Sequence, residues 1–333
     1  MLQRRWWGGH FLRRNAKGDL TTISMNGLLI FAQPLLKVPN IAMRGIGLDI
    51  GLDNVSFFAV GLICTAYMTF FWWLRRLIHN DGLVDFAWPS SFTFIAYYFY
   101  TIGSGDQLRR LIISSMYILC GSRMMLGWLY RLKDGPDRRW DHWRSRWVSG
   151  QGLFGIKNVE INFFAFYQAQ NLTNLAFISI PLYLASRNVS PKLDPNEIFA
   201  IGIWAVSFLL ENVADLQLLL FKVRDETKNE VMQTGLWRFS RHPNYFFEFM
   251  IWCSYSLFAW SSAGKIWHYL LLVGLPVIAY WFLVHFTGVP MTEQASLLKR
   301  GAPYRQYQET TNRFFPWFPK KGNGALAKRT LNS

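Results

Sequence analysis

The sequence GLWRFSRHPNYFFE at residues 235–248 joins a polar cluster to an apolar segment that runs from Tyr245 to about Trp260. Such a segment is suited to a helix in a bilayer, where ionisable side chains are expensive. Two arginines, a histidine, an asparagine and Glu248 nevertheless lie within or beside its first turns. This combination predicts a functional site at a membrane boundary, suited to a charged, phosphorylated ligand.

The composition extends this picture to the whole chain. Hydrophobic residues make up 51% of its 333 residues and include 28 Phe and 16 Trp, which indicates a membrane protein. Each membrane-spanning helix needs roughly 20 residues. Seven segments approach that length: 54–74, 83–103, 111–130, 161–185, 197–221, 245–262 and 266–288. The predicted fold is therefore all-α, a polytopic membrane bundle of about seven transmembrane helices over residues 54–288, followed by a cytosolic tail at 289–333.

The formal charge of +15 arises mostly from arginines and lysines in alternate loops. The positive-inside rule explains this distribution more simply than nucleic-acid binding does. We therefore expect the loops 131–160 and 222–243 and the C-terminal tail on the cytosolic side, and no nucleic-acid partner. The three cysteines form no CxxC pair and no two histidines have metal-ligand spacing, so we expect neither a disulfide framework nor a metal site.

The basic N-terminal segment, residues 1–53, would fall on the charge-poor side. Two explanations stay open: an organellar transit peptide that is removed, or an eighth pass formed by the weak apolar run from Leu20 to Leu36. The loop sequence RLKDGPDRRWDHWRSRW at 131–147 also has two interpretations. An interfacial aromatic belt is favoured over a lid above a ligand.

Ionisable and amide side chains inside the spans cluster in the half of the membrane nearest the basic face, which predicts a water-accessible cavity opening to the cytoplasm. Cations suited to phosphates are Arg123, Arg238, Arg241 and His242. Groups suited to ribose hydroxyls and a carboxamide are Glu211, Asp215, Asn244, Tyr245 and Glu248. Together they form a predicted nucleotide-binding set without a Rossmann fingerprint.

Three motifs carry a resemblance to a known family: ENVADLQLLLFK at 211–222, GLWRFSRHPNYFFEF at 235–249 and the tail at 290–319. Over roughly residues 83–318 the sequence resembles the steroid 5-alpha-reductase superfamily, most closely its uncharacterised, bacterial-type branch. The resemblance implies a seven-helix fold and NADPH held by the C-terminal helices and their cytosolic loops, including the tail. It also implies reduction of a carbon–carbon double bond conjugated to a carbonyl in a steroid-like or other lipid.

The resemblance also implies individual roles. The cofactor positions that it matches are Asp215, Arg241, His242, Asn244, Tyr245 and Glu248, with Glu211, Tyr304 and Tyr307 as further candidates. Steroid reductases engage the substrate carbonyl with a Glu and a Tyr from their early helices, whereas this chain offers Asp85 in LVDFAWP at 83–89. Asp85 could donate a proton only if it stays protonated in a dry site, and Tyr117 or Tyr130 is an equally good donor.

Two other function classes fit part of the sequence. Isoprenylcysteine-type membrane methyltransferases, which use S-adenosylmethionine, also carry an RHP-type motif and a Glu-containing tail. A non-catalytic lipid-binding membrane protein is the third class. All three are integral multi-pass proteins with a lipid ligand and the bilayer as partners. The expected membrane is the endoplasmic reticulum or another organelle in a eukaryote, or the inner membrane in a bacterium, and the sequence does not predict the oligomeric state.

Overall fold

The computed structural model describes residues 12–14, 20–22, 54–135, 139–152, 155–224, 230–286 and 288–320. Two compact units divide the chain, residues 1–62 and 63–333. In the first, β1 (Leu12–Arg14) pairs with β2 (Leu20–Thr22) in an antiparallel arrangement. Most of the proposed transit peptide and eighth pass lies outside the described residues.

Helices account for the seven predicted apolar segments. They are α2 (Asn54–Ile78), α3 (Val84–Ile102), α4 (Gln107–Arg131), α6 (Val159–Thr173) continued by the π-helix η6 (Asn174–Ser179) and α7 (Ile180–Ala185), α8 (Pro195–Val223), α9 (Pro243–Trp260), and α10 (Ile266–Trp281) continued by the π-helix η9 (Phe282–Phe286). The shorter helical elements are η2 (Asp81–Leu83), η3 (Leu132–Asp134), α5 (Arg139–Arg146), the π-helix η4 (Trp147–Gln151), η8 (Gly235–Arg238), α11 (Val289–Arg300) and α12 (Ala302–Thr310). The prediction of a helical fold is confirmed for the described residues apart from the two short strands.

Within the described part of the chain, four helical segments are long and apolar enough to cross a membrane. They are Phe57–Ile78, Gln107–Arg131, Pro195–Val223 and Ile266–Arg300. These four segments are consistent with an integral membrane protein.

Local sequence explains where the long helices begin. Asp194 precedes α8 and forms a capping box with Glu197, while Pro195 occupies the first turn, where its missing N–H is tolerated. Asp106 caps α4 by accepting a hydrogen bond from the backbone N–H of Arg109 at 2.9 Å. These caps fix where α4 and α8 begin, the two helices that carry Arg123, Glu211 and Asp215.

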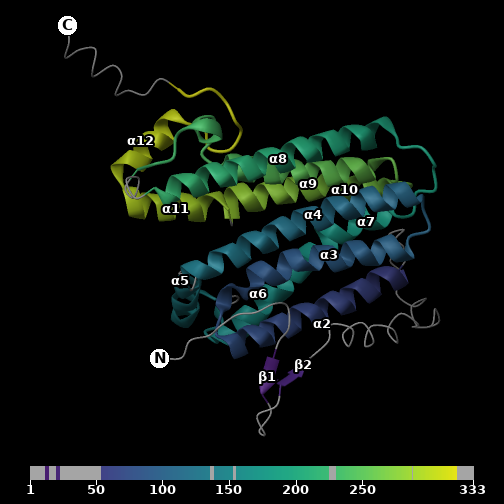
Figure 1. Cartoon of the computed structure of the whole chain (residues 1–333), viewed down its shortest axis with the longest axis horizontal. Helices are drawn as coiled ribbons and strands as arrows, with labels where there is room; N and C mark the ends of the chain where they lie inside the picture. The colour runs from purple at the N-terminus through teal and green to yellow at the C-terminus, as the bar shows by residue number, and fades with distance from the viewer. Residues whose placement is uncertain are drawn as a thin grey trace. The chain divides into compact units, whose positions relative to one another are not determined.

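Close packing sets the distances between the helices. Gly121 of α4 lies against α3, and a Cβ atom there would come 2.5 Å from the carbonyl oxygen of Pro89, so only glycine permits this approach. In the other half of the second unit, α8, α9 and α10 run side by side, and α11 and α12 lie near one end of these helices (Figure 1).

The loop that follows α4 is packed inside the protein. Trp140 of α5 and Trp147 of η4 are buried with Val84, Phe163 and Tyr167 in one hydrophobic cluster. Because both indoles are covered by protein, these two residues are not part of a lipid-facing aromatic belt. The favoured interpretation of this loop was wrong for them, since burial against α3 and α6 depends on contacts that are distant in sequence.

Candidate functional site

The first part of the candidate site is a charged cluster between α4, α8 and α9, made of Arg123, Glu211, Asp215 and Asn244 and called the Arg123 cluster below. Arg123 donates from Nη1 to Asp215 Oδ2 at 2.8 Å and from Nη2 to Glu211 Oε1. The Asn244 side chain donates from Nδ2 to Asp215 Oδ1 at 3.1 Å. Glu211 and Asp215 are one turn apart on α8, so both carboxylates face the same partner helix.

Three polar atoms of this cluster are buried and have no hydrogen-bond partner among the described residues: Arg123 Nε, Glu211 Oε2 and Asn244 Oδ1. Leaving such an atom unsatisfied costs about 1–3 kcal/mol, which favours a ligand or water that satisfies it. The Asp215 side chain is 45% exposed, whereas that of Glu211 is 4% exposed. The cluster is therefore open on the Asp215 side and closed on the Glu211 side.

Glu248 lies one turn beyond Asn244 on α9 and interacts electrostatically with Arg123. An aromatic group follows on the next turn of α9, at Trp252. The centroid of its ring lies 6.3 Å from that of Trp88, 6.1 Å from that of Phe92 and 5.6 Å from that of Phe177. These rings come from α3, η6 and α9. The polar cluster is thus continuous along α9 with an apolar, aromatic interior.

The candidate proton donors occupy different environments. Tyr117 is fully buried on α4, stacks on Tyr255 with ring centroids 3.7 Å apart, and donates from its hydroxyl to the Phe177 carbonyl at 2.8 Å. Asp85 lies in the first turn of α3 and is partly buried. Tyr130 is exposed near the end of α4, with the Lys133 ammonium 3.4 Å from its ring centroid. Tyr130 is therefore the candidate donor with the least dry environment.

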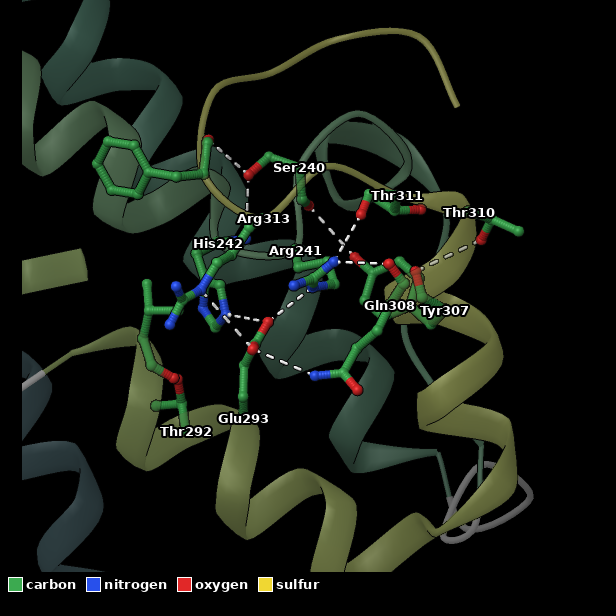
Figure 2. A network of polar contacts seen from close by, with 12 residues as sticks. Ser240, Arg241, His242, Thr292, Glu293, Tyr307, Gln308, Thr310, Thr311 and Arg313 are labelled. Carbon is green, nitrogen blue, oxygen red and sulfur yellow. Dashed lines mark hydrogen bonds and ion pairs between the residues drawn. The ribbon is translucent and has the colours of Figure 1, made fainter. Parts of the chain in front are cut away.

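A second cluster surrounds Arg241 and fastens the C-terminal tail; it contains Arg241, His242, Glu293, Gln308 and Thr311. Arg241 donates from Nε to Glu293 Oε1 at 2.6 Å, and from Nη1 to the backbone carbonyls of Gln308 at 2.8 Å and Thr311 at 2.7 Å. His242 Nε2 lies 3.4 Å from Glu293 Oε1. Figure 2 shows the Glu293 carboxylate between these side chains and the Gln308 amide, which donates to Glu293 Oε2 at 3.2 Å.

Aromatic residues complete this attachment. Tyr307 donates from its hydroxyl to the carbonyls of Trp237 at 2.5 Å and Ser240 at 3.2 Å, and its ring centroid lies 5.8 Å from that of Tyr304. The rings of His242 and Tyr245 stack with an interplanar angle of 5°. Burial raises the pKa of Tyr304 to about 12 and that of Tyr307 further above its usual range, so both phenols remain protonated donors.

Arg238 belongs to neither cluster and lies on an open pocket of about 440 Å³, which adjoins the Arg241 cluster at Thr311. The pocket is lined by Gln233, Thr234, Gly235, Arg238, Thr310, Thr311 and Pro319. Gly235 has a φ of +60° and its Cβ would fall 2.6 Å from the Gln217 amide, whose Oε1 accepts from Leu236 N at 3.0 Å. This tight turn presents the exposed Arg238 side chain to the pocket.

The structure thus distributes the predicted cofactor residues over three places. Glu211, Asp215 and Asn244 lie together, with Glu248 one turn away. Arg241, His242, Tyr245, Tyr304 and Tyr307 form or adjoin the tail attachment, and Arg238 lines the open pocket. Sequence reasoning assigned Arg123 and Arg241 to phosphates, whereas their described contacts are with carboxylates and carbonyls. It did not identify Glu293 as the partner of Arg241, because the two are 52 residues apart and no local pattern links them.

Comparison with known proteins gives three findings. The family profile described as "Protein of unknown function (DUF1295)" matches residues 71–311. An uncharacterized protein of Schizosaccharomyces pombe is 25% identical over 286 residues, which cover 79% of this chain and 80% of that protein. The 3-oxo-5-alpha-steroid 4-dehydrogenase 1 of Homo sapiens, like that of Macaca fascicularis, is 31% identical over 71 residues, which cover 21% of this chain and 27% of the dehydrogenase. No solved structure matches the chain.

Proposed function

Since the chain belongs to the DUF1295 family, we propose that it is a membrane-embedded reductase that uses NADPH. That family lies within the steroid 5-alpha-reductase-like group. The proposed reaction is reduction of a carbon–carbon double bond conjugated to a carbonyl in a steroid-like or other lipid. The local similarity to a steroid dehydrogenase supports this reaction class, and the resemblance to the bacterial-type branch of the superfamily rests on the sequence motifs.

The proposal includes seven membrane crossings. Besides the four qualifying segments, α3 has 19 residues and α9 has 18, close to the roughly 20 that a bilayer needs. The continuous series α6, η6 and α7 supplies the seventh. With seven crossings, the C-terminal tail and the helix ends that carry the Arg123 and Arg241 clusters lie on the cytosolic side. The membrane is the inner membrane of a bacterium or an organellar membrane of a eukaryote.

The Arg123 cluster is the observation that carries the proposal. NADPH presents ribose hydroxyls, a carboxamide and phosphates, and the unsatisfied Glu211 Oε2, Asn244 Oδ1 and Arg123 Nε supply two acceptors and one donor for such groups. Glu248 adds a carboxylate one turn away, and Arg238 offers a guanidinium for a phosphate. The residues therefore fit the cofactor, which supplies a hydride when bound. The tail attached through Arg241, His242, Tyr245, Tyr304 and Tyr307 would hold the Arg238 pocket in place.

The chain must also supply a proton or a hydrogen bond to the substrate carbonyl, where negative charge develops. Asp85 and Tyr117 are the two candidates, and the Tyr117 hydroxyl would have to exchange its hydrogen bond to the Phe177 carbonyl for one to the substrate. If Asp85 has this role, Asp85→Asn lowers single-turnover NADPH oxidation while NADPH still binds. Full turnover in Asp85→Asn together with lost turnover in Tyr117→Phe would assign the proton to the tyrosine.

The decisive experiment is a fluorescence titration of the purified chain with NADPH and, separately, with S-adenosylmethionine. We expect saturable NADPH binding that Asn244→Ala weakens roughly tenfold to hundredfold, because the variant loses a polar contact without losing core volume. Asn212→Ala is the matched control, since its amide donates to the Phe208 carbonyl of its own helix at 2.6 Å. Its NADPH affinity should stay unchanged.

The other outcomes separate the alternative functions. Binding of S-adenosylmethionine without NADPH would favour the isoprenylcysteine-type methyltransferase, and binding of neither nucleotide would favour a non-catalytic lipid-binding protein. If NADPH binds, a screen of enone lipids for substrate-dependent NADPH oxidation identifies the substrate class. Absence of oxidation with every enone would reject the proposed reaction while leaving the cofactor assignment intact.

A further inference from the structure

A second pocket, of about 520 Å³, lies away from both clusters, where α2 ends, α6 begins and α5 packs. Its lining residues are Trp73, Arg75, Arg76, Leu77, His79, Asp81, Arg144 and Glu160. The proposed reductase chemistry uses none of them. Three arginines and two carboxylates in one pocket leave a net positive charge, which favours an anion.

Two of these arginines are paired with carboxylates. Arg75 is buried, donates to Asp81 at 2.7 Å and to Glu160 at 2.5 Å, and lies 3.7 Å from the ring centroid of Phe163. Arg144 also donates to Asp81, from Nη2 at 2.9 Å and from Nε. The buried Arg75 Nε has no hydrogen-bond partner among the described residues. Arg75 is therefore the buried member of the site, whereas the side chains of Arg144 and Glu160 are 43% and 38% exposed.

The third arginine is available to a ligand. The Arg76 side chain is 51% exposed, and its one ion-pair contact joins Nε to Glu160 Oε2 at 3.4 Å. A long, exposed pair of this kind contributes little stability and is easily exchanged for another anion. Next to it, His79 has a φ of 52°, the left-handed conformation in which many helices end, and the Asn80 N–H donates to the Arg75 carbonyl at 3.2 Å, so this turn closes α2 beside the pocket.

An apolar stripe leads out of the pocket along α2. Phe70, Trp73 and Leu77 are exposed, and their spacing of three and four residues places them on one face of the helix. Trp73 and Leu77 also line the pocket, so the apolar and cationic surfaces are continuous. Because α2 is one of the four candidate spans, this exposed stripe would lie against acyl chains in a bilayer.

From this combination we propose that the pocket binds the phosphate-bearing headgroup of an anionic membrane lipid, with an acyl chain along the stripe of Phe70, Trp73 and Leu77. A guanidinium matches phosphate oxygens in charge and geometry, and basic pockets between spans at the cytosolic surface are suited to lipid headgroups. Inorganic phosphate shares the headgroup chemistry but has no part that contacts the stripe.

The test is thermal unfolding of the detergent-solubilised full chain during titration with dioctanoyl phosphatidylglycerol, dioctanoyl phosphatidylcholine or inorganic phosphate. A ligand that binds the folded state raises the melting temperature in a saturable way. We expect this for phosphatidylglycerol and a smaller or no increase for the other two. Equal shifts with both lipids would overturn the anionic headgroup, and an equal shift with inorganic phosphate would overturn the lipid.

Two variants and one control locate the effect. Arg76→Gln should weaken phosphatidylglycerol binding about tenfold or more, because it removes a charge-assisted contact. Leu77→Gln, at another exposed position, should weaken lipid binding without changing the response to phosphate. Arg131→Gln is the control, since Arg131 is an exposed arginine at the end of α4 outside the pocket. Equal loss in Arg131→Gln and Arg76→Gln, or unchanged binding in both pocket variants, would overturn the site.

Discussion

Arg241 and Glu293 form a buried ion pair in which Arg241 Nε lies 2.6 Å from Glu293 Oε1. The pair joins the turn before α9 to α11, and Arg241 extends the connection to α12 through the carbonyls of Gln308 and Thr311. The arginine of the RHP motif therefore attaches the tail to the helix bundle. Replacing Arg241 is therefore expected to affect the stability of the protein.

Replacing Arg241 with alanine should destabilise the protein. The variant leaves the Glu293 carboxylate without its main cation, and removing one partner of a buried pair costs roughly 3–5 kcal/mol. Thermal unfolding of the purified chain measures the loss. Arg238→Ala is the control, because Arg238 is exposed on the neighbouring pocket: we expect an unchanged melting temperature and weaker NADPH binding. An Arg241→Ala protein that melts normally would contradict the attachment.

His242 gives the tail attachment a pH dependence. Burial lowers the pKa of its imidazole below the ordinary 6.5, and this outweighs the opposing effect of the nearby Glu293. Below about pH 6.5, His242 of the unfolded chain binds a proton, whereas His242 of the folded chain stays neutral until the pH reaches its lowered pKa. The stability that neutral His242 contributes is therefore present above pH 6.5 and is lost as the pH falls toward the lowered pKa. Melting temperatures from pH 8 to pH 5 should drop more steeply for the wild type than for His242→Gln. Parallel curves would exclude His242 as the cause.

At the opposite ends of the helices, Arg109 and Glu197 form a buried bidentate pair with contacts of 2.5 Å and 2.9 Å. Arg109 also donates to the carbonyls of Asn188, Ser190 and Lys192. Arg109→Ala should lower the free energy of unfolding by roughly 3–5 kcal/mol, because Glu197 stays buried and unpaired.

The double variant Arg109→Leu/Glu197→Leu separates the charge from the loop contacts. It removes the stranded carboxylate but still leaves three carbonyls without their donor and the Asp194 backbone N–H without the Glu197 acceptor of the capping box, so it should melt between Arg109→Ala and the wild type. A double variant that melts at or below Arg109→Ala would show that the loop contacts and the capping box, and not the ion pair, dominate.

Asn174, the first residue of the π-helix η6, is fully buried, and neither its Nδ2 nor its Oδ1 has a partner among the described residues. Unsatisfied buried polar atoms cost about 1–3 kcal/mol each, so Asn174→Leu should raise the melting temperature. Asn171→Leu is the matched control one turn earlier, where Nδ2 donates to Thr65 Oγ1 at 2.8 Å; it should lower the melting temperature. Equal losses in both variants would indicate that bound water satisfies Asn174.

Much of the fold was predictable because membrane helices are encoded locally. The segment predicted at 197–221 is α8 (Pro195–Val223), and the one predicted at 245–262 is α9 (Pro243–Trp260). An apolar run of span length permits few structures other than a helix, since its backbone groups must be satisfied within the segment. The grouping of Glu211, Asp215 and Asn244 was also predictable, because helical spacing and membrane depth follow from position along each helix.

The helical class, the helix positions and the placement of charged residues along each helix follow from the sequence alone, because helical hydrogen bonds and apolar periodicity depend on residues a few positions apart. Which charges pair with each other depends on how the helices pack. Arg123 pairs with Glu211 and Asp215, Arg241 pairs with Glu293, and Trp140 and Trp147 are buried against α6. The partners in these ion pairs are roughly fifty or more residues apart in the sequence. The spacing of residues within one segment does not specify which distant residue will pair with it.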